Sequence, residues 1–191
     1  MAAWNSLVDT CDDEDIQEKL KPAIEALEVN KRREKDKTHY EFDGKVANGK
    51  YALLSTVVQK VISYGITPQQ CSQDYSKALS EFTNKDSKSA YDTIESLLRN
   101  NNVVMTCPSH EELFDPKKII RTDLVFSEND YQKWWKPQGK KKEVYNKEGN
   151  IRILNQWGYD TIDYFIYAFY VNREKWKLQN KEIKVIKQIS V

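Results

Sequence analysis

Glycine, cysteine and histidine are scarce in this sequence, whose 191 residues include 6, 3 and 2 of them respectively. No GxGxxG, GxxxxGKS/T or GxSxG motif is present, which argues against dinucleotide-dependent oxidoreductases, P-loop nucleotidases and serine hydrolases. Cys11, Cys71 and Cys107 are odd in number and far apart, as expected of reduced thiols rather than a disulfide framework. His39 and His110 stand outside any HExxH or Cys/His cluster. We therefore expect no metal, no cofactor and no catalytic residue, and we favour a non-catalytic protein.

An excess of one charge sign and a long hydrophobic run are also missing. Lys and Arg number 30 against 29 Asp and Glu, and the resulting net charge of +1 excludes a uniformly basic protein that coats nucleic acid. No apolar run approaches the roughly 20 residues that cross a bilayer, and residues 1–10 lack the basic and apolar regions of a signal peptide. We expect a cytoplasmic protein with no membrane partner. Aromatic residues make up 12% of the chain, enough to build a hydrophobic core.

Charge is segregated within the first 37 residues. An acidic cluster from Asp9 to Asp15 precedes a basic cluster from Lys31 to Lys37, and the apolar residues between them follow a partly helical spacing. We expect residues 1–37 to form a charged helical segment and residues 38–191 to form a single α+β domain. The polar stretch 100–102 and Pro108 leave open a subdivision near residues 100–108.

Two amphipathic helices joined by a short turn dominate the first half of this domain. Apolar residues spaced by three and four from Tyr51 to Ile62 predict a helix that closes at Gly65. Thr67 and Pro68 then supply the N-cap and the first residue of a second helix. This succession is the outline of a helix-turn-helix. Further elements are expected around it: a strand over 40–44, a helix over 87–98 and a strand over 103–105.

The second half of the domain predicts a β-hairpin followed by a helix. Strands over 144–146 and 151–154 flank a turn at 147–150, and a strongly apolar helix follows from about residue 159. Three more elements complete the prediction: an extended segment over 119–126, a short helix from Ser127 toward Trp134, and a final strand over 181–191. The expected fold is α+β, with a winged-helix-like helix-turn-helix half followed by a β-hairpin plus helix half.

Four short phrases carry a resemblance to a known family: FDGK at 42–45, KYALL at 50–54, GIT at 65–67 and ILNQWG at 153–158. In this order they resemble an uncharacterised accessory domain, with a helix-turn-helix and an NQWG phrase, of bacterial restriction, phage-defence and mobile-element proteins. The resemblance implies a recognition or regulatory module of such a system rather than an isolated metabolic enzyme.

One hypothesis is that the chain binds DNA or RNA through the second helix and a lysine-rich loop. Amide and hydroxyl side chains near the start of that helix can reach base edges, namely Thr67, Gln69, Gln70, Ser72 and Gln73. Six lysines and two glutamates between residues 133 and 148 give a local net charge of about +4. Phosphate contacts are expected from Lys136, Lys140, Lys141 and Lys142, with the hairpin as a wing.

The main alternative is a protein-interaction module, such as an inhibitor, an immunity-type partner or a specificity subunit. Trp134, Trp135 and Trp157 are candidate anchors, because aromatic residues are enriched at interface hot spots. Trp134 and Trp135 could equally stack on exposed bases, and Trp157 could belong to the hydrophobic core.

A metal-dependent nuclease is a lesser alternative. Glu182 and Lys184 are two residues apart and so share one face of a strand, a spacing that such nucleases use. The upstream acids Asp160 and Asp163, however, fall at the start of a predicted helix rather than on an adjoining strand. A terminal amphipathic strand with a solvated charged face explains the same residues.

Overall fold

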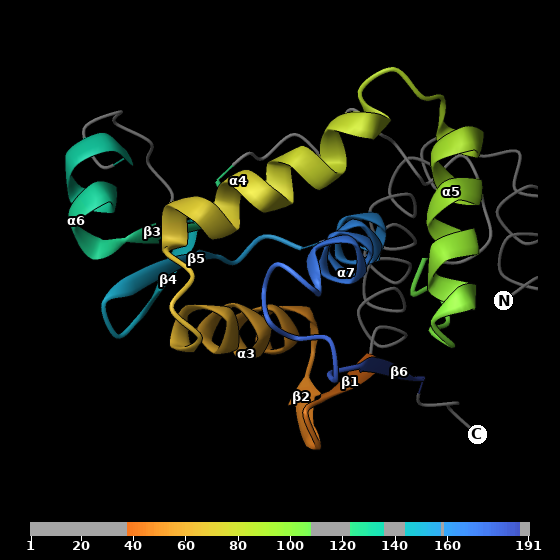
Figure 1. Ribbon diagram of the computed structural model, residues 1–191, viewed down its shortest axis with the longest axis horizontal. Coiled ribbons are helices and arrows are strands. Elements are labelled where there is room, and N and C mark those ends of the chain that lie inside the picture. Colours follow the sequence, from red (N-terminus) through yellow and green to blue (C-terminus); the bar gives the residue numbers. More distant parts are fainter. Residues whose placement is uncertain (1–37, 108–122, 136–143, 158, 188–191) are drawn as a thin grey trace, which may run out of the picture. The chain divides into compact units, whose positions relative to one another are not determined.

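The computed structural model describes residues 38–107, 123–135, 144–157 and 159–187, and only the backbone of residues 135, 159, 160 and 187. These residues belong to one compact unit, Thr38–Gln188. Helices and two small antiparallel sheets make the fold α+β, as predicted (Figure 1). The helical elements are α3 (Lys50–Ser63), α4 (Pro68–Leu79), η1 (Ser80–Phe82), α5 (Ser87–Asn100), α6 (Glu128–Asp130), the π-helical turn η4 (Tyr131–Trp135) and α7 (Tyr159–Asn172). The strands are β1 (Thr38–Phe42), β2 (Lys45–Asn48), β3 (Val125–Ser127), β4 (Tyr145–Glu148), β5 (Ile151–Leu154) and β6 (Ile183–Lys187).

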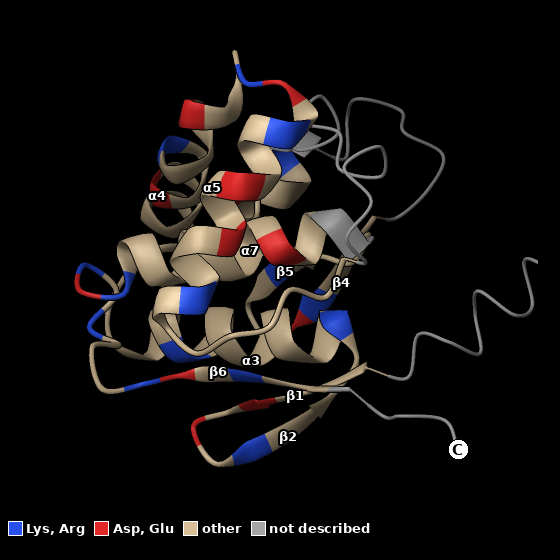
Figure 2. Cartoon of the chain, turned by 90° about the vertical axis from the view of Figure 1, so that its right-hand side faces the viewer, with Lys and Arg blue, Asp and Glu red and all other residues tan. Residues whose placement is uncertain are grey.

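The first sheet has the strand order β2-β1-β6. Asp43 and Gly44 form the two-residue turn between β1 and β2, and both have positive φ angles, 54° and 73°, as a type I′ turn requires. Strand β6 pairs with the other edge of β1, so that Tyr40 lies opposite Val185. Tyr40 and Phe42 are fully buried on the inner face. In Figure 2 this sheet forms a layer below α3, with α7 and α5 above that helix.

The second sheet has the order β3-β5-β4 and contains the predicted hairpin. Its turn consists of Gly149 and Asn150, and Gly149 has a φ of 60°, which suits the first position of a type II′ turn. The strands of the hairpin start and end within two residues of the predicted limits. The hairpin is therefore confirmed, because its turn residues and flanking alternation are local features of the sequence.

Helices α3 and α4 follow one another as the sequence predicts. Gly65, with a φ of 87°, stands in the turn, and the Thr67 side chain accepts a hydrogen bond from the Gln70 amide at 3.1 Å. Pro68 occupies the first helical position. Helix α7 packs against α4 and α5 and brings fully buried Phe165 and Phe169 into the core. Helices α3 and α4 thus pack on a hydrophobic core to which α7 also contributes.

The strand predicted over 103–105 is wrong. Helix α5 ends with Asn102 in the left-handed region, at a φ of 58°, and the Val103 amide bonds back to the Leu98 carbonyl at 2.9 Å. Val103 thus belongs to the turn that closes the helix. Val103 and Met105 are buried while Val104 is exposed, so the apolar run that predicted a strand instead follows the end of a helix.

Two other predicted segments are refined by the structure. Ser127 caps a short helix as predicted, accepting the Asp130 amide at 3.0 Å, but the helix continues as the π-helical turn η4. The final strand begins at Ile183, two residues later than predicted, and residues 188–191 lie outside the described residues. The same is true of residues 119–122 of the predicted extended segment, whereas Val125–Ser127 forms β3. Among the described residues, no helix combines the length and apolar character that a membrane span requires.

Candidate binding groove

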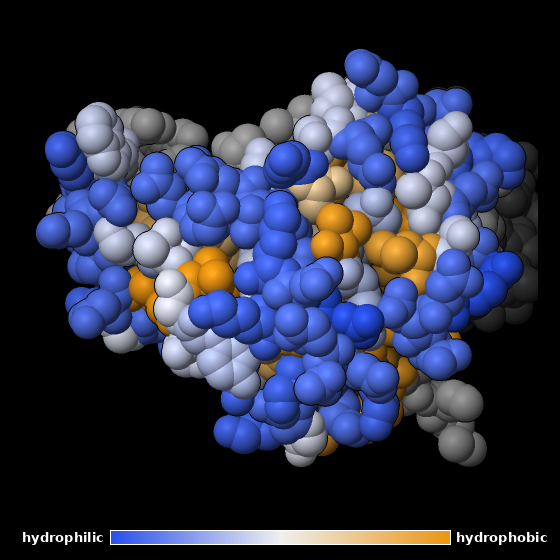
Figure 3. Space-filling model, in the orientation of Figure 1, coloured by the Kyte–Doolittle hydropathy of each residue, from blue (hydrophilic) through white to orange (hydrophobic). Residues whose placement is uncertain are grey.

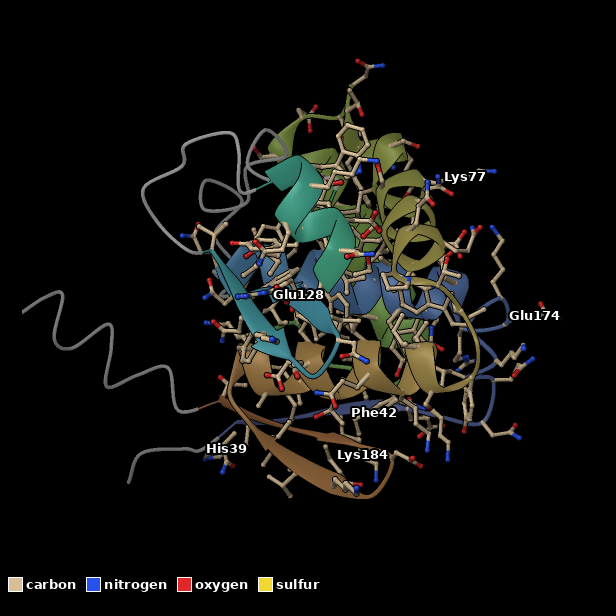
Figure 4. All side chains as sticks on the ribbon, turned by 90° about the vertical axis from the view of Figure 1, so that its left-hand side faces the viewer. His39, Phe42, Lys77, Glu128, Glu174 and Lys184 are labelled. Carbon is tan, nitrogen blue, oxygen red and sulfur yellow. The ribbon has the colours of Figure 1, made fainter. Side chains whose placement is uncertain are left out.

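A groove of about 790 Å³ lies between α4 and the α6–η4 segment, and we call it the α4 groove. One wall is α4, the other is α6–η4, and β3 lies between them. The residues that matter for its chemistry are Gln69, Gln73, Ser76, Lys77, Phe126, Asp130, Lys133 and Trp134. Figure 4 looks onto this side of the molecule and shows α6–η4 beside α4, with Lys77 on α4 and Glu128 at the foot of α6. The groove therefore joins two segments that are far apart in the sequence.

The α4 wall is polar because the helix is amphipathic. Its apolar side, including Cys71 and Tyr75, is buried against the core. Gln69, Gln73 and Lys77 recur every fourth residue, so their exposed side chains form a stripe along one face of the helix. Hydrophilic residues also cover the N-terminal part of α4 on the face shown in Figure 3. The groove thus receives hydrogen-bonding and cationic side chains from α4.

Buried polar contacts fix α4 in place. The Asp74 carboxylate, on a residue 6% exposed, accepts hydrogen bonds from Gln70 Nε2 at 2.9 Å and Trp176 Nε1 at 3.2 Å. The Ser72 hydroxyl donates to the Val125 carbonyl at 2.8 Å and accepts from the Val125 amide at 3.0 Å. Because Ser72 ties α4 directly to β3, one wall of the groove is rigidly attached to the strand between the walls.

The opposite wall rests on an aromatic cluster. The ring of Phe126 packs edge-on against Tyr145 at 5.3 Å and against Tyr131 at 6.4 Å. The Arg152 guanidinium lies 4.6 Å from the Tyr131 ring centre and forms an ion pair with Glu128 at 2.8 Å. The hydrogen bonds from Arg152 and then from Gln132 lower the pKa of Glu128 to about 2. These contacts hold α6 and the start of η4 on the second sheet.

Trp134 projects from this wall into solvent. Its side chain belongs to a residue that is 59% exposed, and the ammonium of Lys133 lies 4.7 Å from the centre of its ring. Within the described part of the chain, no other aromatic ring packs against Trp134. An exposed indole with a cation beside it is a suitable surface for a planar or electron-rich ligand.

Charges in the α4 groove are arranged unequally. Lys77 and Lys133 stand on opposite walls, and among the described residues neither ammonium has a carboxylate partner. Asp123 and Asp130 also line the groove. The Asp130 carboxylate accepts a hydrogen bond at 2.6 Å from the hydroxyl of Ser127, the N-cap residue of α6. The groove therefore offers a ligand one lysine on each wall and also contains two carboxylates.

Only some of the candidate nucleic-acid-binding residues line the α4 groove; others make structural contacts or lie outside the described residues. Gln69 and Gln73 line the α4 groove together with Trp134. Thr67 serves as a helix cap, and Gln70 is bonded to Asp74. Ser72 of α4, expected to face bases, is buried and hydrogen-bonds to the backbone of Val125 in β3. The predicted phosphate contacts lie outside the described residues: Lys136, Lys140, Lys141 and Lys142.

The candidate protein anchors differ in their surroundings. Trp157 is half-buried, donates from Nε1 to the Leu154 carbonyl at 2.8 Å and packs edge-on against Phe165 at 5.7 Å. These contacts give its indole a structural role. Trp134 is free to contact a partner, and for Trp135 only the backbone is described.

The lesser nuclease alternative gains no geometric support. The Lys184 ammonium lies 3.1 Å from Glu41 Oε1, across the first sheet, and Glu182 is exposed just before β6. Asp163 is fully buried, and its carboxylate accepts the amides of Thr106 at 2.9 Å and Cys107 at 2.7 Å. The side chain of Asp160 is not among those described. The described residues include no group of three or more His, Cys, Asp or Glu placed to hold a metal.

Sequence reasoning missed Lys77 and Lys133 as a facing pair. The four-residue spacing of Gln69, Gln73 and Lys77 was visible and could have placed Lys77 on the same stripe. No local pattern could have placed Lys133 across from it, because the α6–η4 wall follows α4 only after a long intervening stretch of chain.

Comparison of the chain with protein-family models, with curated proteins and with solved structures gives no match. The assignment of a function therefore rests on the residues and the geometry of the α4 groove.

Proposed function

We propose that this chain is a non-catalytic nucleic-acid-recognition module, most consistent with a role in a bacterial defence or mobile-element system. The observation that carries the proposal is the α4 groove, where the amides of Gln69 and Gln73 share one space with the exposed indole of Trp134. Amide side chains read base edges, and an indole stacks on base faces. These are the two kinds of contact that a base offers.

Cationic side chains support the same proposal. Lys77 and Lys133 line the α4 groove without a carboxylate partner among the described residues. Four more lysines, at positions 136 and 140–142, follow Trp134 in the sequence. Phosphate contacts supply most of the sequence-independent affinity of nucleic-acid-binding proteins, so lysines that follow a base-reading residue in the sequence support the same proposal.

A winged-helix-like arrangement is part of the proposal. Helices α3 and α4 are the helix-turn-helix, and the β4–β5 hairpin is the wing. Tyr51 of α3 donates a hydrogen bond to Glu148 Oε1 of the hairpin at 2.7 Å, and burial followed by this contact raises the pKa of Tyr51 to about 12. This bond attaches the hairpin to the helix-turn-helix, which supports a wing of fixed position.

The link to defence or mobile-element systems rests on the four phrases of the sequence resemblance. Two of them occupy structurally defined places: FDGK forms the β1–β2 turn, and GIT separates α3 from α4. A protein partner from the same system is the second candidate function. The observation in its favour is Trp134, an exposed aromatic residue at the edge of a groove.

A salt-dependent binding measurement tests the proposal. Fluorescence anisotropy with labelled 12-nucleotide DNA, single-stranded and duplex, should show binding at low salt that weakens steeply as salt rises. Replacing Lys140, Lys141 and Lys142 together by Glu should abolish most of this binding. A matched control replaces three exposed lysines outside the groove by Glu: Lys45, Lys88 and Lys177.

The outcome separates the two candidate functions. Loss of binding in the loop variant with retention in the control supports nucleic-acid recognition. The nucleic-acid proposal would be overturned if neither the single-stranded nor the duplex DNA bound at low salt. It would also be overturned if the triple-lysine variant bound DNA as tightly as the wild-type chain. A stoichiometric protein recovered from the source cell, and lost on replacement of Trp134, would then support the partner hypothesis.

A further inference from the structure

We infer that the α4 groove binds an unpaired stretch of nucleic acid, with one base stacked on Trp134 and neighbouring base edges bonded by Gln69 and Gln73. This inference rests on the proposed function and specifies its ligand as single-stranded rather than duplex. Three features of the groove lead to it: the position of the α4 stripe, the indole, and the placement of the two lysines.

The position of the α4 stripe disfavours a duplex. A recognition helix reads duplex DNA by entering the major groove, which is about 12 Å wide, and it must therefore stand clear of its own protein. Here Gln69, Gln73 and Lys77 face a groove whose other side is the α6–η4 wall. Because that wall stands beside the reading face of α4, the stripe is accessible to a thin, flexible strand and poorly accessible to a rigid double helix.

The indole of Trp134 needs an unstacked base. In a duplex both faces of each base are covered by neighbouring pairs, whereas in a single strand a base can turn out and lie on an aromatic ring. Trp134 is 59% exposed, and the only described contact on its ring is the Lys133 ammonium. Phe126, half-buried, adds apolar surface between the walls.

The two lysines explain how a strand would be held. Lys77 on α4 and Lys133 on η4 line opposite sides of the groove (Figure 4 shows Lys77 on its wall). A backbone that runs between them can offer one phosphate to each. The hydroxyl of Ser76 and the amides of Gln69 and Gln73 remain for the bases. Among the described residues neither lysine has a carboxylate partner, and a ligand that carries both bases and phosphates can use the indole, the amides and the two ammonium groups together.

The experiment compares single-stranded and duplex probes on the full chain. Labelled dT12 and a duplex of dT12 with dA12 are titrated by anisotropy against the wild-type chain, Trp134→Ala and Trp134→Phe. Val104→Ala is the matched control, since Val104 is also 59% exposed but lies outside the groove. Circular dichroism confirms that all variants are folded.

The expected result is tighter binding of dT12 than of the duplex. Trp134→Ala should weaken dT12 binding by roughly 5- to 150-fold, the range that loss of one base–aromatic stack gives, while Trp134→Phe retains most of it. Val104→Ala should leave it unchanged. Lys133→Gln should make the dependence of log affinity on log salt shallower by about 0.7, the value for one phosphate contact on a single strand.

Two contrary results are distinguishable. If the duplex binds as tightly as dT12, or if Trp134→Ala behaves like Val104→Ala, the single-strand inference is overturned while nucleic-acid recognition stands. If neither probe binds at low salt, both the inference and the proposed function fail. Ultraviolet crosslinking of a 5-iododeoxyuridine oligonucleotide gives an independent readout, and a crosslink that maps away from Trp134 would also overturn the inference.

Discussion

Ion-paired lysines lie around the first three-stranded sheet, whereas two lysines without a described carboxylate partner lie on the helices beside the second. Around the first sheet, Asp43 forms ion pairs with Lys60, at 3.0 Å, and with Lys181, and these two partners lower the pKa of Asp43. Beside the second sheet, Lys77 and Lys133 line a groove and, among the described residues, lack such partners. Figure 2 shows acidic and basic residues together on the strands of the first sheet. Charges that are already paired stabilise the fold, whereas unpaired charges in a groove are available to a ligand.

Phe42 on the first sheet and Phe126 on the second differ in how completely they are buried. Phe42 on the first sheet is fully buried and packs edge-on against Phe169 at 5.8 Å. Phe126 on the second sheet is only half-buried and lines the α4 groove. Phe42 thus belongs to the core, whereas Phe126 faces the α4 groove from a sheet whose residues Val125 and Ile153 are buried in that same core.

The largest expected effect comes from removing a core ring of the first sheet. Phe42→Ala should lower the free energy of unfolding by about 3 to 5 kcal/mol, because a fully buried ring is lost and a cavity remains. Phe126→Ala should cost roughly 1 to 2 kcal/mol, since its ring is partly solvated. Urea denaturation measures both. If both variants lost the same free energy of unfolding, Phe42 and Phe126 would not differ in their contribution to the core.

The next effect concerns the attachment of α4 to the second sheet. Ser72→Ala leaves the buried amide and carbonyl of Val125 without their side-chain partner and should cost roughly 1 to 3 kcal/mol. Ser76→Ala, on the same helix but partly exposed, is the control and should change the free energy of unfolding by less than about 0.5 kcal/mol. The free energy of unfolding of each variant is measured by thermal and urea denaturation. Equal values for Ser72→Ala and Ser76→Ala would contradict the proposed attachment of α4 to β3.

A smaller effect tests the contrast between paired and unpaired lysines. Lys77→Gln should leave the stability unchanged and make the salt dependence of dT12 binding shallower by about 0.7. Lys60→Gln should do the reverse: it removes an ion pair with Asp43 and leaves binding unchanged. The distinction between paired and unpaired lysines would be contradicted if Lys60→Gln weakened dT12 binding as much as Lys77→Gln does.

The smallest effect is the pH dependence of the stability that the Glu128–Arg152 ion pair contributes at the start of α6. The pKa of Glu128 is lowered from its usual 4.5 to about 2, chiefly by Arg152, so the pair stabilises the fold above about pH 4.5 and loses this contribution between pH 4.5 and 2. The stability difference between wild type and Arg152→Met should therefore narrow as the pH falls through this range. A difference that stays constant from pH 5 to pH 2 would contradict the assignment.

Local features of the fold were predictable from the sequence. The Thr67–Pro68 helix start and the hairpin turn at Gly149 depend on residues within a few positions of one another, and both are confirmed. Val103 shows the limit of such patterns, because a short apolar run also occurs where a helix is closed by a turn. The α+β class was predictable because it needs only the types of element and their order.

The groove itself was not predictable. The amides of Gln69 and Gln73 and the indole of Trp134 were each singled out, but nothing in the sequence placed them in one space. That placement depends on Ser72 and on the Arg152–Glu128 ion pair, which fix α4 and α6 to the second sheet across long stretches of chain. Ser72 was expected to face bases because of its position near the start of the second helix, whereas its hydroxyl instead bonds both backbone groups of Val125.

The pairing of β1 with β6 has a consequence for the order of folding. Strand β1 is the central strand of the first sheet, yet its partner on one edge is made only when residues 183–187 leave the ribosome. Until then the β1–β2 hairpin exposes a row of unpaired backbone groups, the kind of edge on which nascent chains aggregate. Synthesis therefore leaves the first half of this unit with an open edge until nearly all of it has been made, and closure of the sheet is a late, long-range event.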